Sequence, residues 1–178
     1  MVKKNMDQSI TYENIENYLA RWSKYIIPEE FEILKEFIYN TANNIPSDKL
    51  LIFCGPGNTG KTTLVNELIS LIGKSNYTSV SLSYNMNNNI NNNKNAIIRN
   101  DFHYTKQLMI YNYDEMNNTH DTNIKNILER KPILSKKLYQ PTECHYPKAN
   151  QLLVTNNLRK INDELLELSN VVHFTHIF

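Results

Sequence analysis

A run of nine residues near position 55 combines glycines, a lysine and threonines in a pattern suited to binding phosphate. The run is Gly55, Pro56, Gly57, Asn58, Thr59, Gly60, Lys61, Thr62 and Thr63. In the motif G-x-x-x-x-G-K-[ST], backbone N–H groups of the loop surround the phosphates, the lysine reaches the β and γ phosphates, and the hydroxyl binds Mg²⁺. The sequence therefore predicts a nucleoside triphosphate site, with Lys61 on the phosphates and Thr62 on the metal.

Two acidic residues close an apolar run further along the chain. Asp114 and Glu115 end the stretch 107–115, whose aliphatic and aromatic residues are typical of a buried strand. In this position, Asp114 would hold the hydration shell of Mg²⁺, and Glu115 would orient or deprotonate the attacking water. The pair favours hydrolysis over transfer to a second substrate. An acidic helix N-cap after a strand is the alternative interpretation.

A polar pair, Asn156 and Asn157, directly follows another apolar run, residues 151–155. This run also has the length and composition of a buried strand. We expect it to deliver both carboxamides to the edge of the sheet where the glycine loop and the acidic pair lie. There, one carboxamide would bond the γ-phosphate or the attacking water. The sequence leaves open which of the two asparagines does so.

The elements that must position these residues alternate between strand and helix. The apolar run 49–54 predicts a strand directly before the glycine loop, and leucines at helical spacing predict a helix after it that ends at Gly73. Such alternation indicates an α/β fold with a mainly parallel central sheet flanked by helices. Further strands are expected at residues 77–82, 107–115, 151–155 and 171–178, and a further helix at 123–130.

Residues 1–48 are predicted to form a small helical segment in front of the core, residues 49–178. A proline at the first helical position and glutamates in the first turn mark the start of its second helix at Pro28. The residues expected on the buried faces of the two helices are Ile15, Tyr18, Leu19, Trp22, Phe31, Leu34, Phe37 and Ile38.

The three motifs lie within 103 residues, from Gly55 to Asn157. In this order and spacing, they resemble the ATPase core of superfamily-three helicases, as found in parvovirus- and circovirus-type replication initiators and poxvirus-type primase-helicases. The resemblance covers residues 45–178. It implies an AAA+-like P-loop NTPase fold, ATP and Mg²⁺ as cofactors, and a homo-oligomeric ring, usually a hexamer. It also implies movement on single-stranded DNA in viral or mobile-element replication, with RNA as the other candidate strand.

Members of that group carry a lysine on a β-hairpin that grips the nucleic-acid backbone. A hairpin is expected here from strands at 133–139 and 144–146, so the resemblance points to Lys136 and Lys137. A solvated basic face is the alternative reading. The surrounding segment, residues 125–148, has two acids, Glu129 and Glu143, against six bases, namely Lys125, Arg130, Lys131, Lys136, Lys137 and Lys148.

The sequence departs from the superfamily-three pattern in its arginines. Ring ATPases of this type complete each site with an arginine from the neighbouring subunit, placed after the asparagine motif. Residues 163–170 contain no arginine, so Arg159 is the one candidate left after Asn157, and a surface charge without a role in the site is the alternative interpretation of Arg159. The chain also lacks the nickase or primase region of many relatives, and we expect other replication proteins to start replication.

The composition of the chain limits the classes of protein to which it can belong, and two functions other than a helicase are compatible with the motifs. The chain has 178 residues, of which 40% are hydrophobic and 21% charged, and its formal net charge is +1. Two cysteines and the absence of a long apolar run favour a soluble intracellular protein without a membrane partner. The resemblance implies in addition a viral protein inside an infected cell. Two alternative functions stay open: a P-loop nucleoside or nucleotide kinase, and a nucleotide-gated assembly module that hydrolyses ATP weakly.

Overall fold

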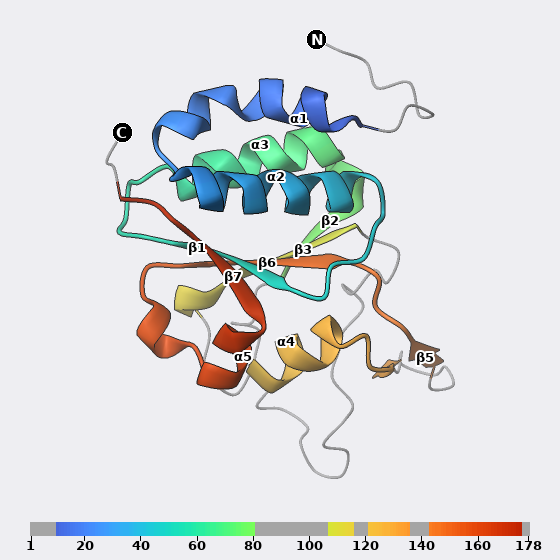
Figure 1. Cartoon of the computed structure of the whole chain (residues 1–178). Coiled ribbons are helices and arrows are strands. Elements are labelled where there is room, and N and C mark those ends of the chain that lie inside the picture. Colours follow the sequence, from blue (N-terminus) through green and yellow to red (C-terminus); the bar gives the residue numbers. More distant parts are fainter. Residues whose placement is uncertain (1–9, 81–106, 116–120, 136–142, 176–178) are drawn as a thin grey trace.

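Five parallel strands form the central sheet of the computed structural model, which describes residues 10–80, 107–115, 121–135 and 143–175 (Figure 1). Their order in the sheet is β2-β3-β6-β1-β7, and every neighbouring pair is parallel. This confirms the predicted mainly parallel α/β fold. The strands are β1 (Leu50–Cys54), β2 (Tyr77–Val80), β3 (Leu108–Asn112), β6 (Asn150–Thr155) and β7 (Ser169–His173).

Helices cover both faces of this sheet (Figure 1). Side chains alternate between the faces along β1, so that Leu51 and Phe53 join one buried cluster and Leu50 and Ile52 join the other. The first cluster lies under α1 (Tyr12–Leu19), the 3₁₀ helix η1 (Ala20–Lys24), α2 (Pro28–Ala42) and α3 (Lys61–Ile72). The second lies over α4 (Asp121–Leu128) and α5 (Asp163–Glu167).

The two helices expected in residues 1–48 are present. Pro28 is the first residue of α2, and the apolar residues expected on its inner face are buried. Tyr18 differs from the prediction, because its side chain is partly exposed and its hydroxyl donates to the Glu67 carbonyl oxygen at 3.2 Å. Both helices pack in one cluster with α3 and the sheet. The division of the chain at residue 48 stays a prediction.

Two strands are shorter than the sequence predicts. The strand expected at 107–115 ends at Asn112, and Tyr113–Glu115 form the 3₁₀ helix η3. The chain turns there because Tyr113 is fully buried against α4 and Asp114 bonds to the end of β6. The last strand, expected at 171–178, covers 169–173.

The predicted hairpin is present as two short antiparallel strands, β4 (Ile133–Ser135) and β5 (Glu143–His145). Arg130 anchors its base: the guanidinium donates to the carbonyl oxygens of Ala149 at 2.7 Å and Ser47 at 3.0 Å. Lys136 and Lys137 lie outside the described residues. In the part of the chain that is described, no helix has the length and apolar character to cross a membrane.

Candidate active site

The carboxyl ends of the strands bring the three predicted motifs to one edge of the sheet. Cys54, the last residue of β1, pairs with Thr155 at the end of β6 and with His173 at the end of β7. The glycine loop leaves β1 at this point and runs directly into α3, which begins at Lys61. In parallel α/β sheets, this edge is where ligands bind.

Gly55 and Gly60 are required by the path of the loop. A Cβ on Gly55 would lie 2.1 Å from the backbone oxygen of Phe174, so a side chain does not fit there. Phe174 is held in place because its N–H donates to the Cys54 oxygen at 2.7 Å. Gly60 has a φ of 89°, in the left-handed region that favours glycine, and it caps α3. The loop therefore turns sharply and presents the N-terminus of α3, a favourable place for anions.

Lys61 is buried inside this loop. Its ammonium group donates to the carbonyl oxygens of Gly55 at 2.5 Å and Pro56 at 2.6 Å, and to the Thr59 hydroxyl at 3.3 Å. Burial lowers the pKa of Lys61 from its ordinary value, and the nearby charge of Asp114 acts in the opposite direction. A phosphate in the loop would compete for these donors and stabilise the charged ammonium.

Asp114 is bonded directly to the end of the neighbouring strand. The Thr155 hydroxyl donates to its Oδ1 at 2.9 Å, and the Asn156 N–H donates to its Oδ2 at 2.9 Å. Strand order explains the contact, because β6 lies between β3 and β1. The acidic motif and the asparagine motif therefore form one cluster beside the glycine loop. The sequence did not assign a role to the Thr155 hydroxyl, although its place at the end of a buried strand was a usable signal.

The two asparagines differ in what their side chains do. The Asn157 Oδ1 accepts from the Arg159 N–H at 3.0 Å and caps the 3₁₀ helix η5 (Leu158–Lys160). The Asn156 side chain is exposed, and none of the hydrogen bonds found among the described residues involves its carboxamide. Of the two, Asn156 is therefore the better placed to contact a bound nucleotide.

A buried contact behind Asp114 was not predicted from the sequence. The Tyr113 hydroxyl donates to Asp121 Oδ1 at 2.6 Å, and the Asn162 N–H donates to Asp121 Oδ2 at 2.9 Å. Burial raises the pKa of Tyr113, which keeps its hydroxyl protonated as the donor. Asp121 thus joins the turn that carries Asp114 to the segment after the asparagine motif. The sequence signals were a tyrosine directly before the acidic pair and an aspartate in the first turn of the next helix.

The other predicted site residues are close in sequence to Lys61, Asp114 and Asn157. Thr62 is exposed in the first turn of α3, and Glu115 is the last residue of η3. Arg159 is exposed in η5, immediately after the asparagine motif. The hydroxyl of Thr62 and the carboxylate of Asp114 are hard oxygen ligands of the kind that Mg²⁺ prefers, so the residues present fit this metal.

Comparison with known proteins agrees with this arrangement. The model of the family described as polyomavirus large T antigen C-terminus matches residues 5–141. The chain belongs to this family. The large T C-terminus family is a family of viral helicase domains. The predicted superfamily-three helicase type is therefore confirmed for the chain as a member of this family. The closer resemblance to parvovirus, circovirus and poxvirus proteins stays a prediction. No match was found among curated protein sequences.

Two solved structures have the same fold as this large T family member. The C-terminal region of NrS-1 is 15% identical with a TM-score of 0.61, and the alignment covers 93% of this chain and 38% of that one. The JCV helicase is 13% identical with a TM-score of 0.56, and the alignment covers 96% of this chain and 47% of the JCV helicase chain. The chain thus spans less than half the length of either structure. These comparisons confirm the helicase-type P-loop α/β fold.

Proposed function

We propose that this chain is the ATP-hydrolysing core of a viral replicative helicase that moves on single-stranded DNA. The contact of Asp114 with Thr155 and Asn156 carries the proposal, because it joins the second and third motifs next to the phosphate loop. Membership of the large T C-terminus family supports it. The proposal also includes assembly of the chain into a homo-hexameric ring and partnership with other replication proteins. It places the protein inside the infected cell.

Each residue of the site has a separate role in ATP hydrolysis. Backbone N–H groups of the loop and Lys61 bind the phosphates, and Thr62 and Asp114 would hold Mg²⁺. When bound there, Mg²⁺ offsets negative charge on the phosphates. Glu115 orients the attacking water and accepts its proton, while Asn156 positions that water or the γ-phosphate.

The proposal is tested by measuring ATP hydrolysis with and without single-stranded DNA, and with single-stranded RNA for comparison. A translocating helicase is expected to hydrolyse ATP faster when the strand is present. ADP formation that depends on an added nucleoside would instead identify a kinase. Tight ATP binding without turnover would identify an assembly module.

Arg159 is proposed to complete the site of the adjacent subunit in the ring. Its exposure in η5, next to the asparagine motif, leaves the guanidinium available to a neighbour. We expect Arg159→Ala to lower ATP hydrolysis at least about tenfold, because an arginine in trans stabilises charge in the transition state. Adding Lys61→Ala subunits, which keep Arg159 but do not hold ATP, should restore hydrolysis to the Arg159→Ala protein. Full activity of Arg159→Ala by itself would contradict the role.

Lys136 and Lys137 are proposed to contact the phosphates of the bound strand from the β4–β5 hairpin. Replacing both by alanine should weaken single-stranded DNA binding and leave hydrolysis without DNA unchanged. Each lost phosphate contact is expected to reduce the slope of log K against log salt by about 0.7. The measurement is a salt titration of affinity, with Lys74→Ala as a control that removes an exposed lysine just beyond the C-terminal end of α3. An unchanged slope in the double variant would rule out the contact.

A further inference from the structure

A carboxylate of the N-terminal helical segment, Glu30, holds the end of strand β7. Glu30 lies in the first turn of α2, and its side chain is 13% exposed. Its Oε2 accepts the backbone N–H of His173 at 2.6 Å, and its Oε1 lies 2.7 Å from the ring nitrogen Nδ1 of the same residue. An ionised carboxylate only accepts hydrogen bonds, so Nδ1 is the donor. The carboxylate therefore binds both the backbone and the side chain of His173.

The contact fixes a strand that lies at the edge of the sheet. Among the described strands, β7 has β1 as its one neighbour. The N–H of Phe174 points toward β1 and donates to the Cys54 oxygen, whereas the N–H of His173 points away from β1. An edge strand carries such backbone groups without a strand partner, and Glu30 supplies the acceptor here. The end of β7 is therefore tied to β1 on one side and to α2 on the other.

Phe174, directly after β7, supports the first glycine of the phosphate loop. Its carbonyl oxygen lies so close to Gly55 that a Cβ there would be 2.1 Å away. The Gly55 carbonyl oxygen in turn accepts from the Lys61 ammonium group at 2.5 Å. Since these groups are in direct contact, a shift of Phe174 would displace Gly55 and the lysine proposed to bind the phosphates.

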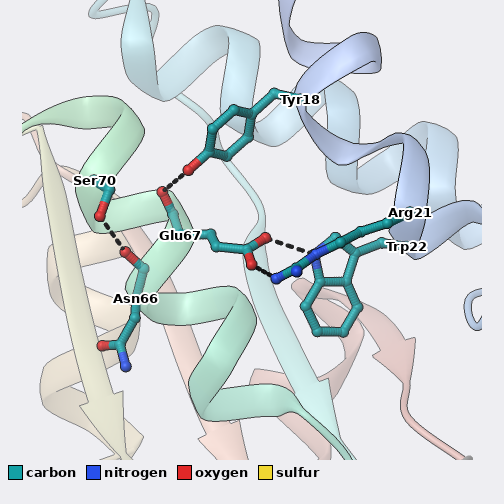
Figure 2. A network of polar contacts seen from close by, with 6 residues as sticks. All are labelled: Tyr18, Arg21, Trp22, Asn66, Glu67 and Ser70. Carbon is teal, nitrogen blue, oxygen red and sulfur yellow. Dashed lines mark hydrogen bonds and ion pairs between the residues drawn. The ribbon is translucent and has the colours of Figure 1, made fainter. Parts of the chain in front are cut away.

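The N-terminal helical segment contacts Phe174 a second time, through Trp22 of η1. The Trp22 ring lies edge-on to the Phe174 ring, with 6.2 Å between their centroids. Figure 2 shows that the Trp22 indole N–H donates to Glu67 Oε2, at 2.7 Å, and that Arg21 pairs with Glu67 Oε1. Glu67 belongs to α3, the helix that follows the loop. The segment therefore contacts both the support of the loop and the helix after it.

We propose that Glu30 is a positioning residue of the phosphate site, which acts through His173 and Phe174 to hold the glycine loop in the conformation that binds a triphosphate. The inference rests on the proposed function, because it takes the glycine loop as the phosphate site. It gives the N-terminal helical segment a part in nucleotide binding that requires no contact between Glu30 and the nucleotide.

The test measures equilibrium affinities for ATP and for inorganic tripolyphosphate, both with Mg²⁺, on the full chain. Glu30→Ala should weaken the binding of both ligands about tenfold, because the end of β7 loses two hydrogen bonds to a charged acceptor. By charge alone, removal of a carboxylate would strengthen the binding of an anion, so the sign of the change separates positioning from electrostatics. Glu30→Gln keeps an oxygen that accepts the His173 N–H, and it should bind both ligands within about threefold of the parent chain.

Two control variants lie on the same helix. Glu29→Ala removes the exposed neighbouring carboxylate in the first turn of α2, so it makes the same change of charge. Lys35→Ala removes a buried ammonium group that pairs with Glu32 at 2.6 Å and Glu16 at 3.3 Å. This second control should lower the midpoint of thermal unfolding, because it separates charged partners within the N-terminal segment. Both controls should bind ATP and tripolyphosphate like the parent chain.

The outcomes separate the positioning role from the phosphate site itself. If Glu30→Ala binds both ligands as tightly as the parent chain, or more tightly, the positioning role is overturned and the phosphate site stands. A loss confined to ATP overturns it too, since the loop binds the phosphates of both ligands. The same holds if Lys35→Ala, at an equal loss of thermal stability, loses as much affinity. If the parent chain binds neither ligand, the proposed function fails and the inference fails with it.

A second variant decides the question if Glu30→Ala does not fold. His173→Ala removes the ring that bonds to Oε1 and keeps the backbone N–H that bonds to Oε2. It should weaken the binding of both ligands about threefold. Unchanged affinities in a folded His173→Ala protein would overturn the positioning role.

Discussion

Lys61→Ala is expected to lower ATP affinity at least about a hundredfold, because it removes a buried cation that reaches the phosphates. Hydrogen bonds from a charged donor are among the strongest that a protein makes with an anion. The ammonium is already inside the loop, held by the oxygens of Gly55, Pro56 and Thr59, so little rearrangement separates it from a bound phosphate. The measurement is a titration with a fluorescent ATP analogue in the presence of Mg²⁺.

The control for this variant is Lys74→Ala, which removes an exposed lysine just beyond the other end of α3. It should bind ATP like the parent chain. Thermal unfolding must be measured as well, because Lys61→Ala leaves two loop carbonyl oxygens without their charged donor. A folded Lys61→Ala protein with normal ATP affinity would show that the glycine loop is not the phosphate site.

Glu115→Gln is expected to lower the rate of ATP hydrolysis at least about a hundredfold while ATP still binds. Glutamine has nearly the same shape but does not accept the proton of the attacking water, and loss of a general base costs 10²–10⁴-fold in typical enzymes. The proposed metal site, Thr62 and Asp114, is unchanged in this variant. Phosphate release at saturating ATP measures the rate, and a titration with ATP measures the affinity.

The matched control is Glu164→Gln on α5. This exposed glutamate pairs with Lys125 at 2.7 Å, and exposed ion pairs contribute little to stability. Hydrolysis by Glu164→Gln should therefore equal that of the parent chain. Near-normal hydrolysis by Glu115→Gln would show that another group activates the water and that the acidic motif is misassigned.

Most elements of the fold could be predicted from the sequence because their signals are local. Apolar runs of strand length predicted β1, β2, β3 and β6, and leucines at helical spacing predicted α3. The end of β3 was missed, since Tyr113 reads as one more buried strand residue. Its hydroxyl bonds to Asp121, eight residues later, which turns the chain into η3. A contact between two elements is not visible in the periodicity of either one.

The proposal that the glycine loop binds phosphate came from the sequence alone. Glycines, Lys61 and Thr62 act at fixed spacing within one turn and one helix start, so their relative positions follow from local geometry. The choice between Asn156 and Asn157 was not determined in this way. It depends on which side chain caps η5, and the structure shows that Asn157 does.

Tertiary structure alone decided which distant segments share the site. β6 lies between β1 and β3, and this order brings Thr155 and Asn156 to Asp114, 41 and 42 residues away in the chain. Packing of α2 on β7 likewise brings Glu30 to His173, 143 residues away in the chain. Parallel strands are joined by crossover connections, so neighbours in the sheet are far apart in sequence. Their pairing is chosen by burial of both sheet faces under helices, which no short stretch of the chain encodes.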